Sequence, residues 1–253
     1  MNMEKQDALS KVPEVTLVFW IIKILATTLG ETGGDAVSMT SLEHDYLTST
    51  VIFAVPFIVL VFLQIRAQKF HPVLYWLTIV ATTTVGTTLA DFSTRSLGIG
   101  YTGGSAILFV LVMASLFTWY KTTGSISVDT VSSPRTEAFY WGTIMFSQTL
   151  GTALGDWTAD EAGFGYGGSA VLFGSMLAIT AALYFWTKIS HTILFWVAFI
   201  LTRPLGAVVG DFLDKPHENG GLELGRYAAS ATLIALMAAC IFFFPHRAAR
   251  RAH

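Results

Sequence analysis

The sequence predicts an all-α polytopic membrane protein with about eight transmembrane helices in four parallel two-helix repeats. Of its 253 residues, 53% are hydrophobic and only 13% are charged, about half the charged fraction of a soluble domain. Crossing the hydrocarbon core takes ~20 apolar residues per helix, so this length accommodates about eight helices and little else. Cys240 is the only cysteine in the sequence, which excludes an intrachain disulfide.

One pattern recurs four times: a Trp, a Gly ten residues later and an Asp five residues after the Gly. Each Trp follows another aromatic residue, and each Gly is followed four positions later by a small residue. Self-similarity at fixed spacing indicates a tandem repeat. These motif positions are Trp20/Gly30/Asp35, Trp76/Gly86/Asp91, Trp141/Gly151/Asp156 and Trp196/Gly206/Asp211.

Apolar runs place the helices in chain order after a short polar tail at residues 1–11, which we expect to be disordered or interfacial. The run from Val15 contains the first repeat and no small-residue cleavage pattern, so we interpret it as a retained helix rather than a signal peptide. The expected spans are residues 15–36, 46–65, 73–93, 104–120, 137–158, 168–187, 192–213 and 226–244. They group into repeats 12–65, 71–120, 136–187 and 191–244 of one transmembrane domain. Each repeat crosses twice, so the four motif helices run in the same direction.

Lys and Arg are concentrated on the side that holds both termini. Ten lie on that side and three in the opposite loops, which predicts that both termini are cytoplasmic. The motif Trp residues then lie near the cytoplasmic face, where we expect an aromatic belt. The ten are Lys5, Lys11, Arg66, Lys69, Lys121, Arg135, Lys188, Arg247, Arg250 and Arg251, and the three are Arg95, Lys215 and Arg226.

The motif glycines form small-xxx-small pairs, which let helix backbones approach closely inside a bilayer. We expect them to pack the motif helices against one another, on the inside of the protein, with the second helix of each repeat outside. The packing positions are Gly30, Gly34, Gly86, Gly151, Gly155, Gly206 and Gly210, with Ala90 completing the second pair.

The four motif aspartates are predicted to share one depth in the outer part of the membrane, because fifteen residues of helix from Trp to Asp span ~22 Å. An ionisable residue within a span marks a functional site by default. Each Asp also has a simpler interpretation, in which it is solvated or caps a following helix. Carboxylates gathered in one layer repel, which favours uptake of a cation or of protons. The candidate binding residues are Glu31, Asp35, Asp91, Asp156 and Asp211.

Two cationic residues break the repeat symmetry inside the spans. Lys23 lies where the other repeats have Ile or Phe, and either supplies a counter-charge or reaches the cytoplasmic interface. Arg203 is deeper, and we expect its partner to be a carboxylate on a neighbouring motif helix, first of all Glu31. Such a pair acts either as a structural lock or as an internal cation that a substrate cation displaces.

Polar residues cluster just before the motif glycines. Taken singly, a Thr in a membrane helix usually bonds back to the preceding turn. Taken together, these residues are candidates to line a polar path from the cytoplasm to the aspartates. They are Thr27, Thr28, Thr83, Thr84, Gln148 and Thr149.

The segment VPEVTLVFWIIKILATTLGETGGDA, residues 12–36, together with the recurring Trp, Gly and Asp, resembles the bacterial membrane proteins built from a tandem repeat of unknown function. The resemblance covers essentially the whole chain and implies a bacterial inner-membrane location. It implies no activity. A shorter stretch, ETGGD at residues 31–35, is similar to the E-x-G-D motif of small cation transporters, but has an extra Gly before the Asp and no basic residue after it.

The function that these features favour is a secondary transporter or exchanger for a cation. Oxygen ligands at Glu31, Asp35 and Asp91 suit a hard divalent cation such as Mn, Mg or Ca as the substrate, and no other cofactor is expected. The alternative is a membrane scaffold or sensor in which the same residues form a structural network; a passive channel is a further one. The sequence has no enzyme motif and no basic face for nucleic acid. The expected partners are the bilayer, the cation and protons, and the oligomeric state stays open.

Overall fold

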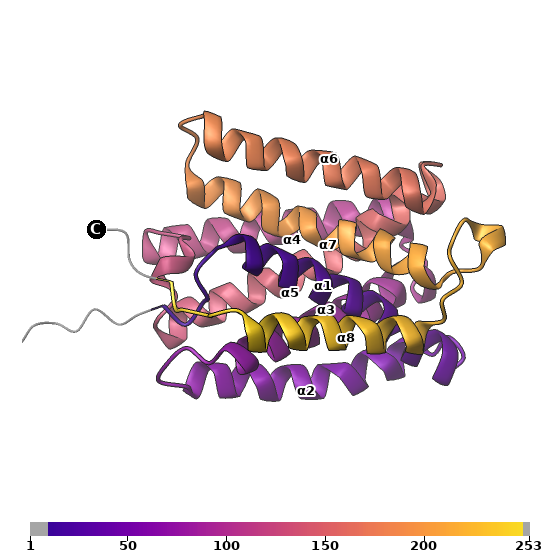
Figure 1. The fold of residues 1–253 in the computed structure, drawn as a ribbon, viewed down its shortest axis with the longest axis horizontal. Coiled ribbons are helices and arrows are strands. Elements are labelled where there is room, and N and C mark those ends of the chain that lie inside the picture. Colours follow the sequence, from indigo (N-terminus) through magenta and orange to yellow (C-terminus); the bar gives the residue numbers. More distant parts are fainter. Residues whose placement is uncertain (1–9, 250–253) are drawn as a thin grey trace, which may run out of the picture.

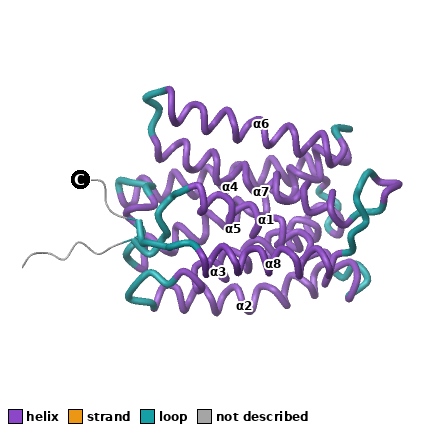
Figure 2. The backbone as a smooth tube through the Cα atoms, viewed as in Figure 1, coloured by secondary structure: helices purple, strands orange, loops and turns teal. Residues whose placement is uncertain are grey.

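The computed structural model describes residues 10–249, which form eight long α-helices and contain no strand beyond one isolated bridge (Figures 1 and 2). The all-α prediction is confirmed. The polar tail before Ser10, with Lys5, lies outside the described residues, as do Arg250 and Arg251. The helices are α1 (Leu17–Asp35), α2 (Tyr46–Arg66), α3 (Pro72–Asp91), α4 (Gly100–Thr123), α5 (Pro134–Asp156), α6 (Gly165–Trp186), α7 (His191–Asp214) and α8 (Arg226–Phe243).

Seven of these eight helices in residues 10–249 are long and apolar enough to cross a membrane. The exception is α5, whose mean hydropathy is lowered by Glu137, Ser147 and Gln148. It packs between α3 and α7 as the third motif helix, with buried polar side chains. The chain is therefore a polytopic membrane protein.

The four motif helices form a closed inner ring. In the ring α1 packs on α3 and α7, and α5 packs on the same two helices from the opposite side. Figure 1 shows α2 and α6 at the outside of the bundle, with α1, α5 and α7 between them. The exposed faces of the outer helices are apolar, as a lipid-facing surface requires. The predicted inner and outer positions are thus confirmed.

Each outer helix packs mainly against the motif helix of the following repeat, not against its own. Thus α2 packs on α3, α4 on α5 and α6 on α7, while α8 packs on α1 and closes the cycle. At one end of the bundle the chain ends also meet, because Pro13 and Ala248 form an antiparallel bridge. Glu137 anchors the same end through an ion pair of 2.5 Å with Lys11.

The motif glycines lie where neighbouring ring helices touch. A methyl group on Gly86 would lie 2.9 Å from Cβ of Gln148, three residues before the next motif Gly. The same relation places Gly30 against Thr83, Gly151 against Arg203 and Gly206 against Thr27. One turn further on, Gly34 faces Thr87, Gly155 faces Ala207 and Gly210 faces Glu31. Contacts that advance together in this way show that the ring helices are parallel and in register.

Three of the four motif Trp residues form a core layer, which corrects the prediction that the motif Trp residues form an interfacial belt, while Trp20 is only partly buried. Trp76, Trp141 and Trp196 are almost fully buried among the other aromatic residues of the ring. The hydroxyl groups of Tyr75 and Tyr140 are 2.6 Å apart inside this layer. The aromatic rings therefore fill the terminal end of the bundle because they face its axis, where lipid is absent.

The glycine contacts predict that Gly86→Ala destabilises the protein, because the added methyl group has no room against the backbone of α5. Overpacking of this kind costs about 1–3 kcal/mol. The matched control is Gly174→Ala in α6, where an added Cβ meets nothing within 4 Å. The control should be neutral or gain about 0.5–1 kcal/mol from the better helix former. Equal unfolding midpoints for the two variants in detergent would contradict the ring packing.

Candidate functional site

The centre of the ring holds one buried guanidinium group that contacts the three other motif helices. Nη2 of Arg203 on α7 donates to Oε2 of Glu31 on α1 at 2.8 Å and to the Thr87 hydroxyl on α3 at 2.6 Å. It also donates to the hydroxyl of Thr152 on α5. The Arg203 side chain is fully buried and that of Glu31 is 4% exposed. We call these four residues the central cluster.

The repeat register explains why the cluster assembles here. Glu31, Thr87 and Thr152 each follow a motif Gly by one residue, so their side chains share one level of the ring. The fourth repeat has Ala207 at that position. Arg203 lies one turn earlier, packs its Cβ and Cγ over Gly151, and extends its guanidinium to the level that Ala207 leaves free. A small residue and a glycine together make room for the charge.

The four motif aspartates lie one turn further from the termini and are held in two pairs. Arg95 lies between Asp91 and Asp156, at 2.9 Å and 3.5 Å. Lys215 lies between Asp35 and Asp211, at 2.9 Å and 3.1 Å. The layer therefore does not contain four free carboxylates.

A third cation completes the outer layer. Arg226, at the start of α8, lies 3.2 Å from Asp214 and 3.9 Å from Asp35. Within residues 10–249 this layer thus joins five buried carboxylates to three cationic side chains. Negative charge is in excess by two, before Glu31 is considered.

One group of carboxylates is close enough to hold a cation. Glu31, Asp35 and Asp211 each offer an oxygen, and these oxygens lie within 4.8 Å of one another. All three residues are buried. Asp91, which the sequence groups with Glu31 and Asp35, lies with Arg95 and Asp156 in the other half of the layer. We call Glu31, Asp35 and Asp211 the carboxylate triad.

Lys215 occupies the mouth of this triad. It caps the end of α7, where its backbone N–H donates to the carbonyl of Asp211 at 2.9 Å. Burial lowers the pKa of its ammonium group, but the carboxylates of Asp211, Asp35 and Asp214 outweigh this effect and raise the pKa well above its ordinary value. Lys215 therefore stays charged at neutral pH and acts as a tethered cation.

Three of the four motif helices change their winding just after the aspartate. The π-helical segments are Ala36–Ser41, Phe92–Ser96 and Trp157–Glu161. Short π-helical turns are frequent at functional sites. The fourth repeat lacks such a segment, because α7 continues as an α-helix to Asp214 and delivers Lys215 instead. The fourth repeat therefore differs from the others at two levels: at the central cluster through Arg203 and Ala207, and at the aspartate layer through Lys215.

The predicted polar lining consists mostly of hydroxyl groups that are satisfied locally. Thr84 and Thr149 donate to carbonyls four residues earlier, each within 3.0 Å. Thr27 and Thr83 bond both to their own helix and to the neighbouring one, through Thr202 O at 3.1 Å and Ala26 O at 3.2 Å. Thr28 is buried without contributing to the central cluster. These threonines tie the ring together more than they line a path.

Sequence reasoning missed a second repeated feature, a Tyr in the first turn of each outer helix. Tyr227 of α8 donates to the carbonyl of Ala36, next to Asp35, at 3.3 Å. Tyr46, Tyr101 and Tyr166 lie within electrostatic range of Asp91, Asp156 and Asp211. The signal was a Tyr followed three or four residues later by Ser in every repeat. Each outer helix thus places a Tyr at the end of the bundle where the motif helix of the following repeat carries its aspartate.

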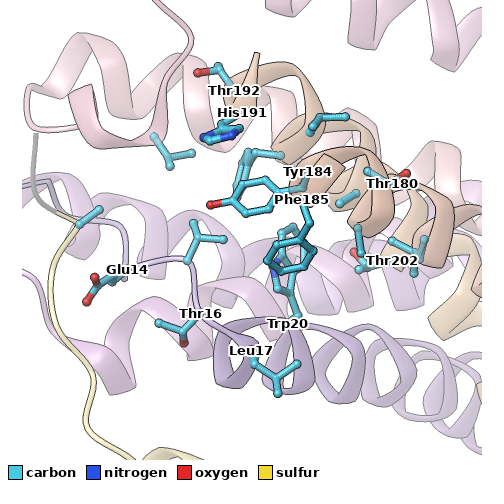
Figure 3. Close-up of a pocket in the computed structure, with 18 of the residues that line it drawn as sticks. Glu14, Thr16, Leu17, Trp20, Thr180, Tyr184, Phe185, His191, Thr192 and Thr202 are labelled. Atoms are coloured by element: carbon cyan, nitrogen blue, oxygen red, sulfur yellow. The ribbon is translucent and has the colours of Figure 1, made fainter. Parts of the chain in front are cut away.

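A groove of about 730 Å³ lies outside the ring, between α1, α6 and α7 near the chain ends. Figure 3 shows Tyr184 and Phe185 of α6 together with Trp20 of α1 in this groove. The carboxylate triad and Arg203 do not contribute to its lining. Its exposed apolar residues, such as Leu17 and Phe185, suit contact with lipid.

The comparisons with known proteins agree with the fourfold architecture. The repeat of unknown function DUF347 matches the chain four times, at residues 18–70, 74–125, 139–190 and 194–249. The matches cover most of the chain, which therefore belongs to this repeat family. No curated protein and no solved structure matches it.

The central cluster predicts a strong coupling between Arg203 and Glu31. Arg203→Met alone leaves the Glu31 carboxylate buried without a cation, and Glu31→Met alone leaves the guanidinium without an anion; each should cost about 3–5 kcal/mol. The double variant removes both charges and should recover most of that loss. Unfolding midpoints of the four proteins give the coupling. Additive losses would show that the pair does not hold the ring together.

Proposed function

We propose that this member of the DUF347 repeat family is a secondary transporter or exchanger for a cation in the bacterial inner membrane, with both termini in the cytoplasm. The observation that carries the proposal is the buried carboxylate triad, whose oxygens lie within 4.8 Å of one another. Carboxylate oxygens at this separation suit a hard cation such as Mn, Mg or Ca.

The charge balance of the outer layer supports cation or proton uptake. Five buried carboxylates share three partly exposed cationic side chains. Unpaired buried charge is costly. A divalent cation offsets the two excess negative charges, and two protons do the same. A layer with these two alternatives is suited to exchange one for the other.

Lys215 gives the site its entry step. Its ammonium lies 2.9 Å from Asp35 and 3.1 Å from Asp211, between two residues of the triad. An arriving cation competes with this ammonium for the same oxygens. Lys215 caps the end of α7, so rotation of its long side chain is enough for the ammonium to leave and return without moving the helix.

Glu31 belongs to both the carboxylate triad and the central cluster. It therefore links cation binding at the triad to the opening of a path to the triad from the terminal side. Its Oε2 accepts from Arg203 at 2.8 Å, and Arg203 closes the axis beneath the triad. A cation that draws on the Glu31 carboxylate weakens this contact and frees Arg203 from α1. Alternating access needs such a bistable element between two faces.

The scaffold or sensor alternative draws on the other half of the layer. Arg95 joins Asp91 to Asp156, and so ties α3 to α5 without any bound ion. In that function the carboxylate triad is one more set of interhelical contacts held by Lys215.

Cation binding is tested by titrating Mn, Mg and Ca into the purified protein and following its unfolding midpoint. A cation present at 100 times its dissociation constant should stabilise the wild type by about 2.7 kcal/mol. Asp35→Asn should abolish this response. The control Asp45→Asn, an exposed residue that caps α2, should keep it, since Asn also caps helices well.

Flux into proteoliposomes then separates the two functions. A transporter keeps its fold but loses flux in Asp35→Asn. The cation-transport proposal is wrong if none of the three ions shifts the midpoint and Asp35→Asn is merely less stable, which is the result expected of a scaffold.

Lys215→Gln is expected to bind the cation at least about tenfold more tightly, because it removes a competitor that makes a charge-assisted hydrogen bond to Asp35 and an ion pair with Asp211. The raised pKa keeps the wild-type ammonium charged, so the difference should persist from about pH 6 to 8. Any stability that Lys215 contributes is present below the ordinary lysine pKa of about 10.4 and is lost only as the pH rises through the higher folded value. Calorimetric titration measures the affinity. Weaker binding in the variant would show that Lys215 supports the site instead of competing for it.

A further inference from the structure

Buried polar atoms without a partner fall into two groups on opposite sides of the central cluster. Among residues 10–249, those in the outer layer include carboxylate oxygens of Asp35, Asp91 and Asp214. Those on the terminal side include the ammonium of Lys23, the Nε2 amide of Gln148, and Nε and Nη1 of Arg203. The outer group consists of carboxylate oxygens and serine hydroxyls, whereas the terminal group combines these nitrogen donors with the Oε1 acceptor of Gln148. Buried polar groups without a partner are rare and call for an explanation.

The three donor residues come from three ring helices and lie at adjacent levels. Gln148 of α5 and Arg203 of α7 both precede a motif Gly by three residues, so they share one level. Lys23 of α1 lies one turn nearer the termini, and its Nζ is 4.3 Å from the centre of the Phe199 ring. Phe199 precedes Arg203 by one turn of α7, which places the ammonium beside the helix that carries the guanidinium. We call Lys23, Gln148 and Arg203 the donor cluster.

When Lys23 is protonated, the donor cluster carries one positive charge more than Glu31 neutralises. Lys23 and Arg203 are both fully buried, and Glu31 is the carboxylate that Arg203 contacts through Nη2. The other two nitrogens of that guanidinium are free, and Lys23 has only an aromatic ring beside it. A buried charge without a counter-charge is strongly unfavourable. Water supplies hydrogen bonds to such a group but no counter-charge.

We infer that the donor cluster is a binding site for a small monovalent inorganic anion, for which chloride and bromide are the probes. The anion accepts hydrogen bonds from Lys23, Gln148 and the free side of Arg203, and neutralises the ammonium. The site is compact, because the Phe199 level and the central cluster enclose it within about two helical turns, or ~11 Å along the axis. That space excludes a bulky organic anion.

This site does not depend on cation transport, but it shares Arg203 with the central cluster. An anion that engages Nε and Nη1 leaves Nη2 with Glu31, and so holds the guanidinium in place from its second side. Arg203 then separates an anion on the terminal side from the carboxylate triad on the other.

The test measures unfolding midpoints of the purified full-length protein in sodium chloride, bromide and gluconate at equal ionic strength and pH. The halides should stabilise the wild type in a saturable way, whereas gluconate is too large to enter. Lys23→Met should weaken the halide response at least about tenfold in apparent affinity, because it removes a charged donor. Lys121→Met, at the exposed end of α4, is the matched control and should respond like the wild type.

The readout is the halide response and not the basal midpoint, which Lys23→Met is expected to raise by removing a buried charge. Gln148→Met provides a second variant that keeps both cations and should weaken the response by removing one donor. Anomalous scattering from crystals grown in bromide should place the ion beside Lys23. The inference is overturned if halides and gluconate act alike on the wild type, if Lys23→Met responds like Lys121→Met, or if bromide is absent from the cluster and water occupies it.

Discussion

The structure depends on one buried group, the Arg203 guanidinium, which donates hydrogen bonds to the other three motif helices. Glycines bring the ring helices close together, but packing alone leaves four similar neighbours free to slide along one another. The guanidinium removes that freedom, because its Nη2 meets Glu31, Thr87 and Thr152 together only when all four helices are in register. It also lies between the aspartate layer on one side and Lys23 and Gln148 on the other.

The site arises from small departures within a regular frame. The frame is set by glycine positions that repeat in all four motif helices. Chemistry enters where one copy differs: Glu31 in the first repeat, Gln148 in the third, and Arg203 with Ala207 in the fourth. Lys215 adds a further difference at the end of the fourth motif helix. Symmetry therefore positions the side chains, and asymmetry gives them their functions.

Much of the fold could be predicted from the sequence, because helix length, apolar runs and the Trp-Gly-Asp spacing are local signals. The pairing of Arg203 with Glu31 was also predictable, since a deep guanidinium needs a carboxylate and Glu31 is the nearest in level. The split of the aspartates into two pairs was not expected. Arg95 and Lys215 each follow a motif Asp by four residues, which is the spacing of an ion pair on one helix face. From the sequence, these two residues count only as loop charges that predict the orientation in the membrane. The burial of the Trp layer depends on whether each indole points to the axis of the bundle or to lipid. The spacing of Trp, Gly and Asp along the sequence does not determine this direction.

The packing of each outer helix on the following repeat can be compared with the packing in a ring of separate subunits. In a ring of four separate two-helix subunits, the outer helix of each subunit would pack on the neighbouring subunit. The same pattern of contacts occurs here, between α2 and α3, α4 and α5, α6 and α7, and α8 and α1. In a ring of identical subunits every substitution appears four times, and four guanidinium groups on one axis repel each other. A single chain with four copies of the repeat is free of that restriction, because each copy carries its own residues. A single arginine facing a single glutamate on the axis is an arrangement that four identical subunits do not allow and that one chain of four different repeats does.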